Sequence, residues 1–238
     1  MSFDSRYYNF RQKLETGFMM VSIVFLVILS LSVILYIADM ESRLSGRPNE
    51  FRDLLCASWQ TPWGIVTSFF VHANEPHLTR NMIALLIFLV LFVTLNVFYT
   101  KKEMKRRILF SSIIIFIIPI ISNLISIIVY PKVIIIGSSG IVYSLEGLCF
   151  TLSIINFMGL KHKTRQLTNE TSVVLAASLI NIIVCTMFIY NLIFFPELFL
   201  GSRNSIVIGV HALSFCGGCL SALFYSTKLQ SPRIPILN

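Results

Sequence analysis

The sequence predicts an all-α polytopic membrane protein, in which six transmembrane helices form a bundle with one long, partly helical first loop. Hydrophobic residues make up 55% of the 238 residues and charged residues only 13%, against about a quarter in a soluble domain. Six apolar segments are long enough to cross a hydrocarbon core, which needs roughly 20 residues of helix. They cover approximately residues 17–38, 78–100, 108–130, 137–160, 172–195 and 205–227. We expect a single membrane domain over residues 1–238.

The first segment is expected to be a retained helix. The residues before it include Arg6, Arg11 and Lys13 but also Asp4 and Glu15, and no small-residue cleavage site follows it. Both features are atypical of a secretory signal peptide.

The connection over residues 39–77 is too long for an ordinary loop. It mixes charged residues with large apolar ones, among them Trp59 and Trp63. Because tryptophan is enriched at the lipid–water interface, we expect a partly helical element on or in the outer leaflet. A small soluble cap is the alternative, disfavoured by how few polar residues follow Asp53.

The distribution of lysine and arginine predicts the orientation of the bundle. Thirteen of these residues lie on the side of the two termini, in the terminal segments and in the loops 101–107 and 161–171, and six lie on the other side. By the positive-inside rule both termini are cytoplasmic. This orientation also accounts for the net charge of +8, so no nucleic-acid partner is expected.

Polar residues recur at one depth in three of these segments. The segments beginning near 78, 137 and 205 all enter from the non-cytoplasmic side, and they carry His77 with Asn81, Ser139, and His211 in their first turns. At 1.5 Å per residue, Ser139 and His211 lie on the order of 10 Å below the surface. Polar groups at membrane depth are costly and therefore indicate function.

Stripes of small residues predict which helices meet. One face of the segment 137–160 carries Gly140, Ser144 and Gly147, and one face of the segment 205–227 carries Ser214 and Gly218 beside His211. Such stripes let transmembrane helices approach closely. Packing through them would bring His211 to Ser139, within the roughly 2.6–3.2 Å that an activated serine nucleophile needs.

Each signal alone has a plainer interpretation. Gly and Ser around position 139 are common packing residues in membranes, and His211 could serve as a proton relay or a core residue. His77 and Asn81 could simply cap a helix or meet interfacial water. Their common depth and side favour one shared site.

Together these residues resemble the rhomboid family of intramembrane serine proteases. His72, His77 and Asn81 match the family's His-x4-His-x3-Asn pattern, and Gly137-Ser138-Ser139-Gly140 with Tyr143 matches its Gly-x-Ser-Gly-x3-Tyr helix. His211 followed by small residues matches the sixth helix. The resemblance runs from about residue 59 to 220. Two positions depart from the family pattern, Gly64 after Trp63 and Ser214 three residues after His211.

The resemblance implies a role for each of these residues. Ser139 would be the nucleophile and His211 the general base and acid. The side chains of His77 and Asn81, with the Ser139 backbone N–H, would form the oxyanion hole. Tyr143 would stack on the His211 imidazole, and His72 would be a supporting polar residue. Gly137 and Gly140 would support the turn around the nucleophile.

The sequence thus predicts a serine endopeptidase that cleaves transmembrane segments of other proteins within the lipid bilayer. We expect a multi-pass protein of the cell membrane whose active site opens to the non-cytoplasmic side, and no metal or cofactor. One alternative is a non-catalytic rhomboid-like factor that binds and routes membrane proteins. A small proton-coupled transporter is less favoured, because only the acidic residue Glu146 lies well within an apolar segment. The sequence does not define the oligomeric state.

Overall fold

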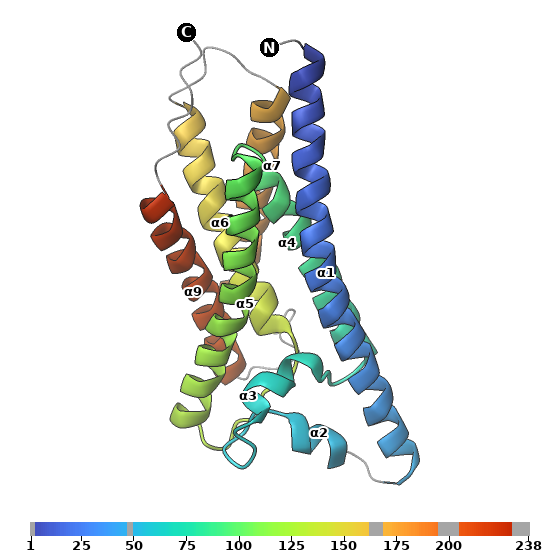
Figure 1. Ribbon diagram of the computed structural model, residues 1–238. Helices are drawn as coiled ribbons and strands as arrows, with labels where there is room; N and C mark the ends of the chain where they lie inside the picture. Colours follow the sequence, from blue (N-terminus) through green and yellow to red (C-terminus); the bar gives the residue numbers. More distant parts are fainter. Residues whose placement is uncertain (1–2, 47–49, 162–168, 195–204, 230–238) are drawn as a thin grey trace.

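The computed structural model describes residues 3–46, 50–161, 169–194 and 205–229, and within these residues the protein is all-helical. The single β-bridge in this part joins Ala57 and Ile135. Each apolar segment predicted from the sequence coincides with a long helix (Figure 1). These helices are α1 (Phe3–Leu44), α4 (Glu75–Leu95), α5 (Lys101–Val129), α6 (Ser139–Lys161), α7 (Asn169–Phe194) and α9 (Ser205–Leu229).

Four of these helices, α1, α4, α5 and α6, are long and apolar enough to cross a membrane. The protein is therefore a membrane protein. In α7 and α9 the apolar stretches among the described side chains are shorter, Thr171–Met187 and Ile208–Phe224. The count of six membrane crossings stays a prediction.

The helices differ from the predicted segments mainly at their ends. α4 ends at Leu95, before the predicted residue 100, whereas polar turns extend α1 and α5. α5 begins at Lys101 rather than near residue 108, so the predicted loop 101–107 is the start of the helix. A capping box explains this: the Glu103 backbone N–H donates to Thr100 Oγ1 and the Glu103 carboxylate accepts from the Thr100 N–H. The hydropathy pattern misses such polar turns because it registers only the apolar part of a helix.

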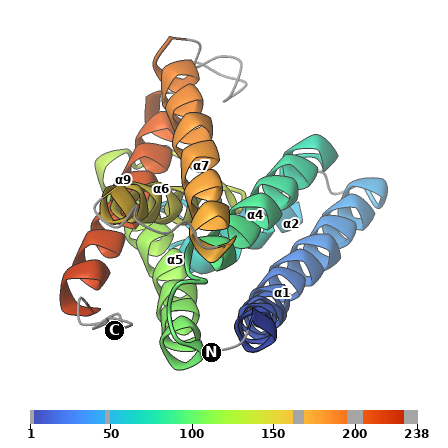
Figure 2. The same ribbon diagram turned by 90° about the horizontal axis from the view of Figure 1, so that it is seen from above.

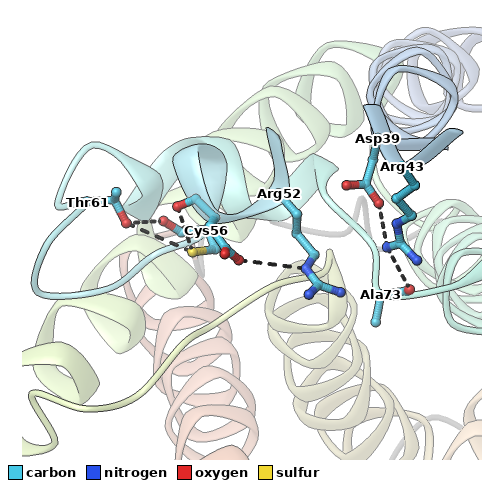
Figure 3. A network of polar contacts seen from close by, with 7 residues as sticks. Asp39, Arg43, Arg52, Cys56, Thr61 and Ala73 are labelled. Atoms are coloured by element: carbon cyan, nitrogen blue, oxygen red, sulfur yellow. Dashed lines mark hydrogen bonds and ion pairs between the residues drawn. The ribbon is translucent and has the colours of Figure 1, made fainter. Parts of the chain in front are cut away.

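α1 likewise continues past residue 38 to Leu44. Its last turns contain an ion pair between Asp39 and Arg43, at i,i+4 spacing and 2.5 Å. Arg43 also donates to the backbone carbonyl of Ala73, just before α4 (Figure 3). The end of α1 is therefore tied to the segment that leads into α4.

α6 is the central helix of the bundle. It packs against α4, α5, α7 and α9, whereas α1 lies at the edge against α4 and α5 (Figure 2). A Cβ at Gly147 would overlap the carbonyl oxygen of Phe215, and one at Gly218 would overlap that of Ser144. The backbones of α6 and α9 are thus in contact, as the small-residue stripes predicted.

Between α1 and α4 lie three short helices: α2 (Glu50–Leu55), α3 (Gly64–Thr67) and the 3₁₀ helix η1 (Ser68–Phe70). They sit at the end of the bundle where α4 begins (Figure 1). Thr67 Oγ1 donates to the Leu55 carbonyl at 2.7 Å and Trp63 Nε1 to that of Leu54 at 2.9 Å. Thr61 closes the intervening turn: its Oγ1 donates to the Cys56 carbonyl at 2.7 Å (Figure 3) and lies 2.7 Å from Ser58 Oγ. The location of the segment between α1 and α4 at a membrane surface stays a prediction.

The same segment gives the reason for Gly64, one of the two departures from the family pattern. A Cβ at this position would overlap the backbone carbonyl of Cys56. A side chain therefore cannot fit where α3 crosses the chain leaving α2.

Candidate active site

The residues before α6 form a tight turn that fixes where the helix starts. Gly137 has φ +103°, a conformation that a residue with a Cβ rarely adopts. Its backbone N–H donates to the Ser68 carbonyl at 2.8 Å. The next carbonyl, that of Ser138, accepts from Val142 and begins the helical ladder. Ser139 is therefore the first residue of α6, where backbone N–H groups have no acceptor within the helix.

The structure brings Ser139 and His211 together. The distance between Ser139 Oγ and His211 Nε2 is 2.9 Å, although 72 residues separate them. His211 lies in the second turn of α9 and is buried. Its other ring nitrogen, Nδ1, has no hydrogen-bond partner among the residues that the structure describes. Within the part of the chain that the structure describes, the arrangement is a serine–histidine pair without a third member on Nδ1.

Tyr143 lies against the face of the His211 ring. The ring centroids are 4.2 Å apart and the planes meet at 37°. Tyr143 lies one helical turn after Ser139 on α6, so the helix that carries the serine also holds the imidazole. Gly140, the residue after Ser139, leaves room for Pro119 of α5 and for Ser214 of α9; a Cβ there would lie 3.0 Å from Pro119 Cβ.

The side chains of His77 and Asn81 lie next to Gly137 in the turn before α6. A Cβ at Gly137 would be 2.7 Å from His77 Cε1 and 3.4 Å from Asn81 Nδ2. Both side chains thus lie against the residue two positions before Ser139. The cap of α4 explains their placement, because the Asn74 side chain accepts from the His77 N–H at 2.9 Å and starts the helix.

The Asn81 amide is a buried donor. The residue is 9% exposed, and Nδ2 has no hydrogen-bond partner among the described residues. An unpartnered buried donor costs about 1–3 kcal/mol. Such groups therefore concentrate at functional sites rather than in ordinary packing.

His72 contacts Ser138 rather than the Ser139–His211 pair. Its Nε2 lies 3.2 Å from Ser138 Oγ and 3.4 Å from the Ser138 backbone N, and its Nδ1 lies 3.3 Å from the Phe70 carbonyl. Its ring also meets that of His77 edge-on, at 5.3 Å. Burial, with a smaller contribution from the charge of His77, lowers the pKa of His72 to about 4. His72 is therefore a neutral hydrogen-bonding group near pH 7.

Two residues of the site were not singled out from the sequence, Ser138 and Asn123. Asn123 of α5 is buried, and its amide donates to the Ile65 carbonyl at 3.3 Å and to Ser68 Oγ at 3.4 Å. It thereby holds the η1 segment that in turn binds Gly137. For Asn123, the signal available in the sequence was a side-chain amide inside an apolar segment. For Ser138, the signal was a polar residue immediately before a helix.

The fold and the site define a class: a membrane-embedded helical bundle in which one helix presents a serine and another a histidine at hydrogen-bond distance. The family model described as Rhomboid domain matches residues 60–228, well over half of the chain. The chain therefore belongs to the rhomboid family. α1 and α2 lie outside the matched residues. No curated protein matches this chain.

Proposed function

We propose that this protein is an intramembrane serine endopeptidase that cleaves transmembrane segments of other proteins. The observation that carries the proposal is the 2.9 Å distance between Ser139 Oγ and His211 Nε2. It lies within the range in which an imidazole activates a hydroxyl nucleophile. Membership of the rhomboid family supports the same activity.

In the proposed mechanism, His211 Nε2 accepts the Ser139 proton while Oγ attacks the carbonyl carbon of the scissile peptide bond. The negative charge that develops on the carbonyl oxygen is stabilised by His77, Asn81 and the Ser139 N–H. Loss of one such donor commonly costs on the order of 10²–10³ in rate. The tetrahedral intermediate collapses as His211 protonates the leaving amine. Water, deprotonated by the same imidazole, then hydrolyses the acyl-enzyme.

The proposed orientation follows from the positive-inside rule. Both termini face the cytoplasm, and the site, at the end of the bundle that holds α2 and α3, opens to the opposite side of the cell membrane. The segment between α1 and α4 lies in the outer leaflet, where the exposed Trp59 and Trp63 would meet lipid headgroups. Substrates are transmembrane helices with residues such as Gly or Ser, because a peptide bond in a stable helix is shielded from attack.

The test is cleavage of a tagged single-pass membrane protein by the purified enzyme in liposomes. Ser139→Ala and His211→Ala should each abolish cleavage. Ser144→Ala is the matched control, since Ser144 is a buried serine of the same helix whose hydroxyl has no partner among the described residues. It should cleave like the wild type.

Labelling with a fluorophosphonate separates the enzyme from a non-catalytic factor that binds and routes membrane proteins. An activated serine reacts with this electrophile, and labelling should require both Ser139 and His211. A wild-type protein that is folded but neither labelled nor active on any transmembrane substrate would favour the binding factor. Cleavage retained by Ser139→Ala would contradict the proposed mechanism.

A further inference from the structure

Ser138 and His72 form a fully buried contact beside the proposed active site. Ser138 is 0% exposed and His72 is 1% exposed. Both the hydroxyl and the backbone N–H of Ser138 lie within hydrogen-bond distance of one atom, His72 Nε2. The two residues are 66 positions apart, so the contact joins distant parts of the chain.

The partners of the ring determine its tautomer. A backbone N–H can only donate, so His72 Nε2 accepts from Ser138. The proton of the neutral ring is then on Nδ1, which donates to the Phe70 carbonyl. The imidazole therefore bridges η1 and the turn before α6, and each of its nitrogens has a defined role.

The two ends of this bridge lie next to the two halves of the proposed site. Ser138 immediately precedes the nucleophile Ser139. His72 is two residues before Asn74, whose side chain caps the helix that carries His77 and Asn81. A shift of the turn relative to α4 would therefore change the distance from Ser139 to the oxyanion donors.

We propose that Ser138 is a positioning residue, whose hydrogen bonds to His72 hold the nucleophile in register with the oxyanion donors of α4. The proposal rests on the proposed protease function. The Ser138 hydroxyl bonds to His72. We propose that it acts on the active site through the backbone that Ser138 shares with Ser139.

The first test compares Ser138→Ala with Ser144→Ala on a transmembrane peptide substrate in liposomes. Each variant removes one buried hydroxyl, that of Ser138 from the turn before α6 or that of Ser144 from α6 itself. Of the two, only Ser138 is bonded to His72. Ser138→Ala should lower kcat about tenfold, the effect of one lost hydrogen bond expressed in the transition state, with KM within about twofold of the wild type. Ser144→Ala should change neither constant by more than about twofold. Equal kcat for Ser138→Ala and the wild type would overturn the proposal.

The second test is a double-mutant cycle with His72. His72→Leu removes the acceptor and should lower kcat at least as much as Ser138→Ala, whereas His72→Gln keeps an acceptor and should recover most of the activity. In the Ser138→Ala background only the backbone N–H of residue 138 still donates to His72. His72→Leu should therefore cost less there than in the wild type, because the bond from the hydroxyl is already absent. Independent, multiplicative losses would overturn the proposal. If Ser138→Ala does not fold, the comparison of His72→Gln with His72→Leu decides alone.

Failure of the proposed function is recognised separately, because the wild type would then not cleave the substrate, or Ser139→Ala would cleave it as well as the wild type does. If Ser139→Ala is inactive and Ser138→Ala behaves like the wild type, only the role of Ser138 is excluded.

Discussion

The His211 imidazole contacts Tyr143 on one face and the Ser139 hydroxyl at Nε2. No partner holds its Nδ1 among the described residues, and the tilted Tyr143 ring lies 4.2 Å away. In a serine triad a carboxylate at Nδ1 fixes the tautomer and orients the ring. Here the ring packs against Tyr143, a residue of the helix that carries Ser139. Ser139 and Tyr143 therefore move together when α6 moves. In the proposed mechanism, the nucleophile thus stays in place relative to the ring that supports the general base His211.

Asn81 permits a prediction that separates catalysis from stability. Asn81→Ala should lower kcat on the order of 10²–10³, as expected for a lost oxyanion donor. It should leave the thermal midpoint unchanged or slightly higher, because the amide Nδ2 has no partner to lose among the described residues. Kinetics in liposomes and thermal unfolding in detergent measure the two effects.

A buried asparagine just after the same helix serves as the control. The Asn96 amide donates to the Phe92 carbonyl at 2.7 Å. Asn96→Ala should therefore lower the thermal midpoint while kcat of the folded enzyme stays near that of the wild type. A large fall in the midpoint of Asn81→Ala, without a fall in kcat, would show that Asn81 is structural.

At the scale of elements, the distance between α6 and α9 determines whether the serine and the histidine meet. Gly147 and Gly218 place the two backbones in contact. Ser139 begins α6 and His211 lies near the start of α9, so a small separation of the helices increases the Ser139–His211 distance directly. Ser214, the second departure from the family pattern, is fully buried and still leaves this packing close.

Gly147→Ala tests this dependence. The new methyl group would overlap the Phe215 carbonyl, which is backbone and cannot rotate away. We expect a lower thermal midpoint, a destabilisation of about 1–3 kcal/mol, and at least a tenfold loss of kcat/KM. Gly159→Ala on the same helix is the control, since its Cβ would have nothing within 4 Å. Unchanged activity in Gly147→Ala would mean that α9 can shift without separating the pair.

At the scale of the whole molecule, the segment between α1 and α4 links the edge of the bundle to its centre. Arg43 of α1 donates to the Ala73 carbonyl, and Asn123 of α5 donates to Ser68 Oγ in η1. The Ser68 carbonyl accepts from the Gly137 N–H. His72 continues this link to the start of α6. Stability of the assembled molecule should therefore depend on the charge state of His72.

The dependence on pH has a definite sign. The pKa of His72 is about 4 in the folded protein, below the ordinary 6.5, because burial disfavours the charged ring. Between these two values the unfolded chain binds the proton and the folded protein does not. The contribution of neutral His72 to the free energy of unfolding is thus complete above about pH 6.5 and is lost as the pH falls toward 4. We expect the thermal midpoint in detergent to fall over this range, and to fall less steeply in His72→Gln, which cannot titrate. Parallel curves for the two proteins would refute this role.

Much of the site could be predicted from local patterns. His77 and Asn81 share a helix face because of their i,i+4 spacing, and the small residues at 140, 147 and 218 mark close helix contacts. The ends of α1 and α5 were missed because polar turns extend both helices beyond their apolar parts. The bridge between His72 and Ser138 was missed because neither residue belongs to a periodic pattern.

The membrane class, the positions of the long helices and the residues of the proposed site could all be predicted from the sequence, because hydropathy and helical spacing are local properties. The 2.9 Å distance between Ser139 Oγ and His211 Nε2 and the bond between Ser138 and His72 follow from the folded arrangement of the helices. Ser139 and His211 are 72 positions apart in the sequence, and His72 and Ser138 are 66 positions apart. Both contacts depend on how closely the helices pack and on the path of the turns between them, which no local spacing encodes.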